Sequence, residues 1–342
     1  MRFGLGVPTG TEGLMYPVPY ADATQAVALA VEAERLGFES VWANDHVTTQ
    51  HYVRAEFDEA PRYYDPFSYL SFVAARTSRV RLATAVMVLP FRHPVVAAKQ
   101  LATLDQLSGG RVVAGVGIGA YREEFEAMHP GGRLHRGEHA EESFQALTAL
   151  LTHRRSSYEG RWIRYRDVES SPLPVQRPLP LLSGGNAPAC RRRAGRYGHG
   201  WLPACLTPGE VALGLADIGA EAEQAGRPLP AGFEVALQVG VCVGATREEA
   251  ERRFERSQLA NHMRSLSRST LKDQKGGGFA ERNLIGTVDD VREQIDAYAE
   301  AGATTMAALL FAADTVPETL EMMEEFSQTV MPAYAEAPEP IR

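Results

Sequence analysis

The sequence predicts an α/β protein built as a single (β/α)8 barrel, or TIM barrel. Short apolar runs alternate with longer amphipathic segments along most of the 342 residues, as strands and helices would. Eight such strand-then-helix units follow one another, the number that closes this barrel. Runs such as "TAVMVL" are apolar throughout, because parallel strands are covered on both faces. Barrels of this length commonly form one domain, so we expect a single domain over residues 1–342.

The first half of the chain supplies four units. The expected strands are 2–8, 39–45, 80–89 and 111–119, and the expected helices are 21–36, 66–78, 94–110 and 137–152. Gly37 stands where a glycine commonly ends a helix. Pro66 follows Asp65 and suits the first turn of a helix, where a missing N–H leaves no bond unmade.

The second half repeats the alternation. The expected strands are 179–185, 200–204, 233–243 and 304–311, and the expected helices are 187–196, 208–225, 246–260, 288–302 and 316–330. Two insertion segments, 154–178 and 262–286, exceed a minimal barrel. Segments of this length in a compact domain are commonly lids or binding loops, although a plain surface loop is the alternative.

The composition excludes several classes of protein. The chain has 35 basic and 43 acidic residues, whereas nucleic-acid binders usually carry a basic surplus. It has no apolar run of about 18 residues that would span a membrane. The first residues enter a strand without a secretory signal, and the three cysteines form no C-x-x-C pair. We therefore expect a cytoplasmic protein without structural zinc. No H-E-x-x-H or G-x-S-x-G motif supports zinc hydrolysis or serine esterase chemistry.

A glycine-rich stretch, "RVVAGVGIGAYREEF" (111–125), matches the dinucleotide-binding pattern at Gly115, Gly117 and Ala120. That fingerprint needs an acidic residue at the end of the next strand, but Glu138 lies in a helical pattern. The stretch is also the fourth of eight units, so we do not expect NAD here. Its glycines either let the backbone approach a flat or anionic ligand or serve close packing alone.

The second strand ends in three polar residues, Asn44, Asp45 and His46. Active sites of barrels collect at the carboxyl ends of the strands. His46 is therefore the strongest acid/base candidate, and we expect Asp45 to orient it. One of Glu123 and Glu124 could also point into the mouth, although acidic residues suit a solvated helix start as well.

A second candidate site follows the fifth strand. Ser183, Gly184, Gly185 and Asn186 precede a helix and could cradle a phosphate, or Asn186 could simply cap the helix. The surrounding segment is basic and hints at an anionic ligand, although scattered solvated arginines would look the same. Residues 133–196 hold six acidic residues and twelve arginines, namely Arg133, Arg136, Arg154, Arg155, Arg161, Arg164, Arg166, Arg177, Arg191, Arg192, Arg193 and Arg196.

Several stretches resemble the bacterial luciferase-like family of flavin- and deazaflavin-dependent oxidoreductases. They are "GFESVWANDH" (37–46), the block 78–125, "LLSGGNAPACRRRAGRYGHGW" (181–201) and "IGTVDDVREQIDAYAEAGAT" (285–304). The resemblance covers nearly the whole chain and is greatest to the branch that uses coenzyme F420. It implies a barrel with the cofactor ring at the carboxyl-end mouth.

The resemblance also implies roles for particular residues. The implied catalytic residues are His46, Asp45 and, more weakly, Glu124. The implied cofactor-binding residues are Ala85, Val86, Gly117, Ile118, Gly119, Ala120, Tyr121, Ser183, Gly184, Gly185 and Asn186. Among these, the pair at 85 and 86 lies where the family often has a bulge with a non-prolyl cis peptide. Some relatives carry a residue with a small hydroxyl at position 85, where this chain has alanine.

The function that follows is F420-dependent hydride transfer to or from a small organic substrate. An alternative is a two-component monooxygenase that uses O2 and reduced FMN from a separate reductase. A catalytically silent flavin-binding relative and a phosphate-binding isomerase are further alternatives. The family suggests a homodimer, and the basic segment could hold the polyglutamate tail of F420. The loops that would contact the substrate offer five aromatic side chains, Tyr52, Phe57, Tyr63, Tyr64 and Phe279.

Overall fold

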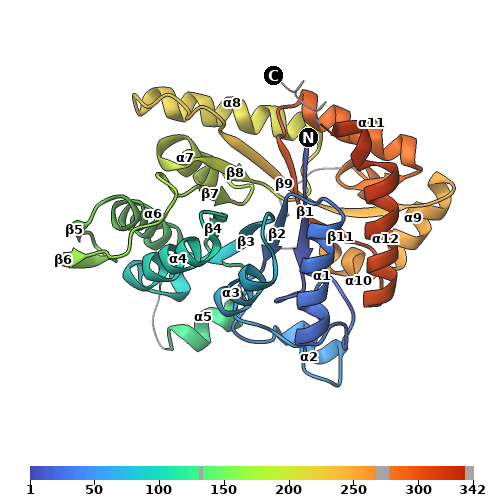
Figure 1. Cartoon of the computed structure of the whole chain (residues 1–342), viewed down its shortest axis with the longest axis horizontal. Helices are drawn as coiled ribbons and strands as arrows, with labels where there is room; N and C mark the ends of the chain where they lie inside the picture. Colours follow the sequence, from blue (N-terminus) through green and yellow to red (C-terminus); the bar gives the residue numbers. More distant parts are fainter. Residues whose placement is uncertain (131–133, 267–276, 336–342) are drawn as a thin grey trace.

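The structure, a computed structural model, describes residues 1–130, 134–266 and 277–335 and contains a closed barrel of eight parallel strands (Figure 1). The barrel strands are β1 (Arg2–Val7), β2 (Ser40–Ala43), β3 (Arg81–Val88), β4 (Val112–Gly117), β7 (Leu181–Gly184), β8 (Gly200–Leu202), β9 (Glu234–Val243) and β11 (Thr305–Phe311). Neighbours run in the order β9-β11-β1-β2-β3-β4-β7-β8, and pairing of β8 with β9 closes the ring. The predicted barrel and its eight strands are confirmed.

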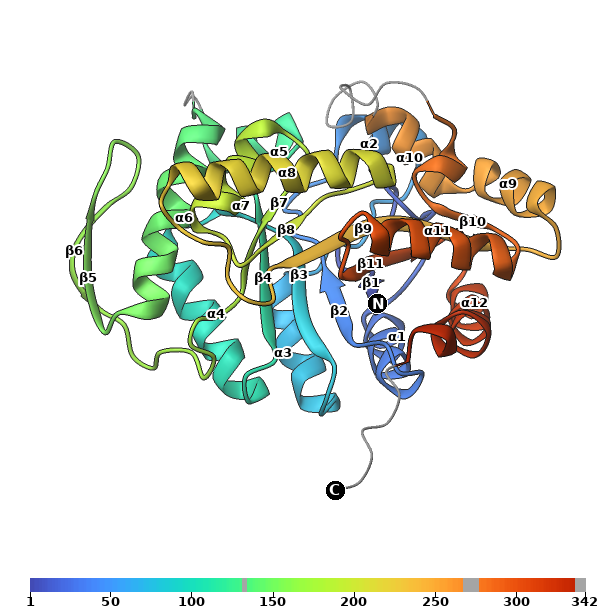
Figure 2. The same cartoon turned by 90° about the horizontal axis from the view of Figure 1, so that it is seen from above.

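Helices surround the barrel, as the alternation predicts (Figures 1 and 2). They are α1 (Ala23–Arg35), α3 (Pro66–Arg76), α4 (Pro94–Ser108), α6 (Arg136–Thr152), α7 (Pro188–Tyr197), α8 (Pro208–Gln224), α11 (Val288–Glu300) and α12 (Val316–Thr329). Side-chain caps fix several starts: Asp22 accepts from Gln25 N, and Asp65 accepts from Ser68 N. None of the described helices is long and apolar enough to cross a membrane.

Two segments differ from the sequence-based expectation. The expected helix 246–260 is two helices, α9 (Arg247–Arg256) and α10 (Gln258–Leu266), which separate at Ser257. Part of the insertion 262–286 is therefore helical, because α10 buries an apolar face that includes Leu259 and Met263. Residues 267–276 of that insertion lie outside the described residues, and β10 (Leu284–Gly286) pairs with β9 at its end.

The other insertion, 154–178, contains an antiparallel hairpin of β5 (Arg155–Glu159) and β6 (Arg164–Glu169). Figure 2 shows this hairpin beside α6, away from the barrel strands. Two short helices at strand ends were not expected as separate elements, α2 (His51–Glu56) after β2 and α5 (Arg122–Met128) after β4. Both follow strands whose ends carry candidate site residues.

The barrel interior is filled by one large ring together with alanine, valine and leucine side chains. Trp42 is fully buried among Ala83, Ala236 and Ala307. A Cβ atom at Gly4 would lie 2.4 Å from Nε1 of Trp42, so only glycine leaves room for this ring. The interior is a packed core rather than a pore, and it leaves the carboxyl ends of the strands as the place for a ligand.

Candidate active site

The site is built where β2, β3 and β4 end. His46 follows β2, and Nδ1 of its ring lies 2.9 Å from Oε1 of Glu124, a residue in the first turn of α5. The same oxygen accepts a hydrogen bond of 3.0 Å from the backbone N–H of Val47. The side chain of Glu124 is only 1% exposed. A buried carboxylate thus fixes the histidine ring by one of its two nitrogens.

The other nitrogen of His46 is available for a ligand. Among the residues that the structure describes, none forms a hydrogen bond with Nε2. The ring itself is confined, because its centroid lies 5.5 Å from that of Tyr63 and 5.6 Å from that of Tyr121. A Cβ atom at Gly10 would lie 2.6 Å from Cδ2 of the histidine, so the loop after β1 also needs glycine here. His46 is half-buried, and Nε2 is its free functional atom.

The prediction that Asp45 orients His46 is wrong. The carboxylate of Asp45 instead accepts two hydrogen bonds from Arg92, of 2.5 and 2.9 Å, and one of 2.8 Å from the N–H of Val88. Side chains of successive residues in an extended segment point to opposite sides, so Asp45 and His46 face different neighbours. Asp45 ties the end of β2 to the end of β3. Glu124, rather than Asp45, is the carboxylate that orients His46.

Glu123, the neighbour of Glu124, has a different role. Its Oε1 accepts from the backbone N–H of His51, 2.9 Å away, and so ties α5 to the start of α2. The sequence left open which of the two glutamates enters the mouth, and the structure assigns that position to Glu124. The structure also gives a role to Arg92, which the sequence analysis did not single out: it binds the carboxylate of Asp45.

The third strand carries the expected irregularity. The peptide bond between Ala85 and Val86 is cis, and the pairing of β3 with β4 shifts register at this point. Nδ2 of Asn44 donates to the carbonyl of Ala85 at 3.1 Å. Val86 is half-buried at this bulge, whereas Ala85 is buried. An apolar side chain is therefore presented next to the histidine-bearing strand end.

The glycines of β4 and β7 make room for Val86. A Cβ atom at Gly117 would lie 2.6 Å from Cγ2 of Val86, and one at Gly184 would lie 2.4 Å from Cγ1. Gly119 has φ 75°, and a Cβ there would meet the ring of Phe125 at 2.8 Å. Close packing against protein side chains thus explains these glycines.

The end of β7 and the residues that follow it form more hydrogen bonds within the protein than expected. The hydroxyl of Ser183 is buried and donates to the carbonyl of Cys190 at 3.0 Å, so it is not free to bind a phosphate. Asn186 does not cap α7, whose N-cap residue is Ala187. Instead its side-chain amide exchanges two hydrogen bonds with the backbone of Ala204, of 2.8 and 3.0 Å. The backbone of Gly185 is bonded as well, because its N–H donates to the carbonyl of Leu202 at 3.0 Å and its carbonyl accepts from Nε1 of Trp201 at 2.9 Å.

Most arginines of the basic segment pair with acidic residues. Among the described residues, the arginines with a carboxylate within 4.0 Å are Arg154, Arg155, Arg161, Arg164, Arg191, Arg193 and Arg196. Arg133 lies outside the described residues. Most of the described arginines in this segment are therefore ion-paired within the protein, which neither interpretation of the sequence anticipated.

Arg136 is one of four described arginines of this segment that have no such carboxylate, the others being Arg166, Arg177 and Arg192. Its guanidinium lies 3.7 Å from the centroid of the Phe125 ring and donates to the carbonyl of Ala120 at 3.2 Å. Within the described part of the chain, no carboxylate lies within ion-pair distance of it. Burial lowers the pKa of Arg136, while the charge of Glu124 raises it. This cation lines a cavity of about 770 Å3 together with Trp162, beside the loop that follows β4.

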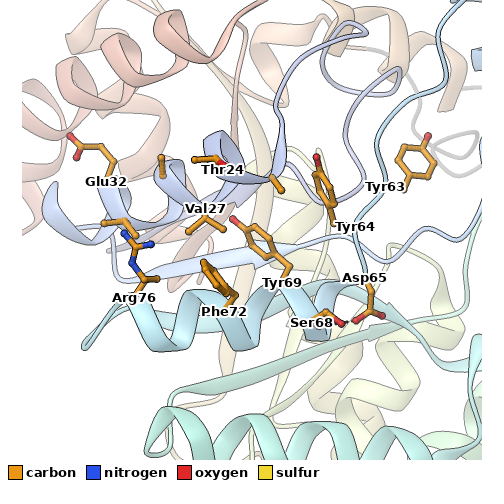
Figure 3. Close-up of a pocket in the computed structure, with 13 residues that line it drawn as sticks. Thr24, Val27, Glu32, Tyr63, Tyr64, Asp65, Ser68, Tyr69, Phe72 and Arg76 are labelled. Carbon is orange, nitrogen blue, oxygen red and sulfur yellow. Dashed lines mark hydrogen bonds between the residues drawn. The ribbon is translucent and has the colours of Figure 1, made fainter.

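A second cavity, of about 800 Å3, lies between α1 and α3 on the outside of the barrel (Figure 3). Its wall includes Val27, Tyr69 and Phe72, so it is an apolar groove between neighbouring helices. It contains none of the predicted catalytic or cofactor-binding residues, although two of the loop aromatics, Tyr63 and Tyr64, line it. No group of three potential metal ligands occurs among the described residues.

Comparison with known proteins agrees with this geometry. The profile of the luciferase-like monooxygenase family matches residues 1–305. The crystal structure of monooxygenase RslO1 from Streptomyces bottropensis superimposes with a TM-score of 0.80 at 26% identity, covering 98% of this chain and 100% of that chain. The FMNH2-dependent dimethylsulfone monooxygenase of Pseudomonas putida is 28% identical over 80% of this chain and 79% of its own length. An F420-dependent glucose-6-phosphate dehydrogenase of Kineococcus radiotolerans is 31% identical over 51% of this chain and 50% of its own length.

Proposed function

Because the chain belongs to the luciferase-like monooxygenase family, we propose that it is an F420-dependent oxidoreductase that exchanges hydride with a small organic substrate. The chain is a flavin- or F420-dependent oxidoreductase of this family, and its relatives named above use reduced FMN or F420. F420 as the cofactor, and hydride transfer as the reaction, are the parts that we propose.

The observation that carries the proposal is the state of His46. Glu124 holds Nδ1 at 2.9 Å, and Nε2 is left without a partner among the described residues. A histidine fixed in this way can give a proton to a substrate oxygen, or take one from it, through Nε2. The His46 ring is half-buried and bound to the carboxylate of Glu124. It lies at the end of β2, beside the bulge at Val86 in β3.

The residues of the mouth fit a flat cofactor ring. Val86 offers an apolar surface, and the backbone from Gly117 to Tyr121 runs alongside it on β4 and its loop. Arg136 offers a positive charge without a carboxylate partner, which suits the anionic part of F420 or FMN. When bound, a reduced deazaflavin supplies hydride, and the protein supplies orientation, a proton and exclusion of water.

A second candidate function is a two-component monooxygenase. It is favoured by the relatives that are named monooxygenases, in particular the dimethylsulfone enzyme and RslO1. A separate reductase would then supply FMNH2. Oxygen consumption separates the two candidates, because hydride transfer from F420 proceeds without O2 whereas monooxygenation consumes it.

Cofactor titration tests the proposal. Purified protein is titrated with F420 and with FMN, each followed by its own fluorescence, and the two dissociation constants are compared. The proposal predicts saturable F420 binding that is tighter than FMN binding. Tight FMN binding together with no affinity for F420 would contradict it and favour the monooxygenase.

A further inference from the structure

Gln238 is a polar residue whose side chain points into the barrel. It lies in β9, and its backbone pairs regularly, because its N–H donates to Pro203 and its carbonyl accepts from Cys205, both at 2.9 Å. Ala236, two residues earlier, belongs to the interior cluster around Trp42. Side chains two residues apart in a strand point to the same face of the sheet. Gln238 therefore faces the interior, one step nearer to the carboxyl ends of the strands than the layer of Trp42.

The exposed part of Gln238 lies at the mouth of the barrel. Its chain neighbours Leu237 and Val239 are fully buried and belong to the core beneath the surrounding helices. On the inner side, Ala236 and Trp42 are fully buried too, so the interior is closed below Gln238. Gln238 is nevertheless partly exposed. Its side chain thus reaches solvent through the carboxyl-end mouth, at the same end of the barrel as His46.

The side-chain amide of Gln238 is not bonded within the protein. Among the residues that the structure describes, neither Oε1 nor Nε2 of Gln238 forms a hydrogen bond. Asn44, a carboxamide at the end of β2, differs, because its Nδ2 donates to the carbonyl of Ala85 at 3.1 Å. Polar side chains in a protein interior normally have hydrogen-bond partners, since an unpaired polar group is costly to bury. The amide of Gln238 is therefore left for a molecule that enters the mouth, to which it offers both a donor and an acceptor.

Gln238 lies across the barrel from the bulge at Val86. The strand orders β9-β11-β1-β2-β3 and β3-β4-β7-β8-β9 both place β9 four strands from β3, the strand that carries Val86. In a closed ring of eight strands, two strands so placed are opposite each other. A cofactor ring that lies against Val86 consequently turns its other face toward Gln238. The space between that face and Gln238 is where a substrate would lie, with His46 at its side.

We propose that Gln238 is a further substrate-contacting residue, whose carboxamide binds a second polar group of the organic substrate while His46 meets the group that is oxidised or reduced. A carboxamide carries no charge and both donates and accepts, so it suits a neutral group such as an amide rather than an ion. The site therefore selects substrates that combine a reacting hydroxyl or carbonyl with an amide-like group. This inference rests on the proposed function, because it takes the space between the cofactor ring and Gln238 as the substrate site.

Two ketones of similar shape test the inference. para-Acetylbenzamide carries a carboxamide where para-isopropylacetophenone carries an isopropyl group, and both keep a ketone for His46. Each is titrated by NMR into protein saturated with oxidised F420, or with oxidised FMN if F420 does not bind, so that no reaction occurs. The ratio of the two dissociation constants is compared between wild type and variants, which cancels the different hydrophobicity of the probes. We expect Gln238→Met to shift this ratio about fivefold toward the isopropyl ketone, the effect of one neutral hydrogen bond.

Gln258→Met is the matched control, because Gln258 is a glutamine of α10 whose amide already donates to the carbonyl of Gly13 at 3.2 Å. It should leave the ratio unchanged. Thermal unfolding of Gln238→Met supplies a second measurement. Because the amide of Gln238 has no partner in the protein to lose, this variant should unfold at the wild-type temperature or above it.

Four results would overturn the inference: no saturable binding of para-acetylbenzamide, an unchanged ratio in Gln238→Met, an equal shift in Gln258→Met, or a marked loss of thermal stability in Gln238→Met. Cofactor affinity is measured first for each variant and is read independently of the ratio. Failure of the wild-type protein to bind F420 would contradict the proposed function, whereas an unchanged ratio with intact F420 binding would contradict only this inference.

Discussion

His46 and Glu124 are 78 residues apart and share a hydrogen bond of 2.9 Å between Nδ1 and Oε1. The bond joins the ends of two barrel strands, because His46 follows β2 and Glu124 follows β4 and its loop. The carboxylate determines how the ring is oriented and which nitrogen is left for chemistry.

His46→Ala should lower kcat by about 10² to 10⁴, the usual range for loss of a general acid or base. Cofactor affinity should remain, because Val86 and the β4 loop are unchanged. His51→Ala is the control, since His51 also lies near a glutamate but its side chain is 73% exposed. Steady-state kinetics measures kcat of the two variants, and cofactor titration measures their affinity for the cofactor. Equal losses in the two variants would refute a catalytic role for His46.

Asp45 and Arg92 should act as a structural pair. Their side chains are 1% and 12% exposed and are joined by two hydrogen bonds. Arg92→Met should lower the free energy of unfolding by about 3–5 kcal/mol, because it leaves a buried carboxylate unpaired. Urea denaturation measures this. Arg122→Met, which breaks an exposed pair with Glu126, should have little effect, and a similar loss there would argue against the burial explanation.

His262 should make the protein less stable in acid. Its pKa is lowered from 6.5 to about 3, so below 6.5 the unfolded chain binds a proton that the folded protein does not. Stability is therefore complete above 6.5 and falls as the pH drops, by about 1.4 kcal/mol per pH unit for one such group. The stability difference between wild type and His262→Gln, measured by denaturation from pH 7.5 to 4.5, should show this slope. A difference that does not vary with pH would contradict a buried neutral histidine.

Glu234 should stabilise the opposite end of the barrel. It is bound by Arg81, by Arg2 and by the hydroxyl of Thr305. Although burial raises the pKa of Glu234, the guanidinium of Arg81 brings it below its ordinary 4.5 overall. The stabilisation is thus present above pH 4.5 and is lost as the pH falls through the lower folded value.

Glu234→Gln should consequently be less stable than wild type at pH 7, and the difference should narrow toward pH 3. Thermal unfolding across this range provides the measurement. Glu159→Gln serves as the control, because the Glu159–Arg164 pair is exposed on the β5–β6 hairpin. A difference for Glu234→Gln that grows in acid would refute the ion-pair explanation.

Arg136 should bind the anionic part of the cofactor. Arg136→Met keeps an apolar stem over Phe125 but removes the charge, so the cofactor dissociation constant should rise about tenfold or more, the loss of a charged hydrogen bond. The dependence of this dissociation constant on salt concentration should also weaken. Arg161→Met is a control from the same cavity, since Arg161 already pairs with Glu138. If both variants bind the cofactor as wild type does, Arg136 has no such role.

The barrel could be predicted from the sequence because the patterns that indicate its strands and helices are local. Each strand is an apolar run, and helix starts carry caps such as Asp22 and Asp65. The resemblance also located the cis peptide at Ala85 and Val86. The hairpin within 154–178 was not predicted, because its strands are mostly exposed and polar and lack an apolar pattern.

The hydrogen-bond partners within the site could not be predicted in the same way. The sequence places Asp45 beside His46, but which side each of them faces depends on how β2 ends. Glu124 reaches the histidine only because α5 begins directly after Tyr121. The contact of Tyr52 with His262 depends on α10, a helix that the sequence did not separate from its neighbour.

The structure of the protein bound to F420 tests the central claim most directly. We predict that the deazaflavin ring lies against Val86 and the backbone from Gly117 to Tyr121, with Nε2 of His46 facing the space above the ring. A ring bound elsewhere, such as in the groove between α1 and α3, or a His46 that faces away from it, would contradict the account.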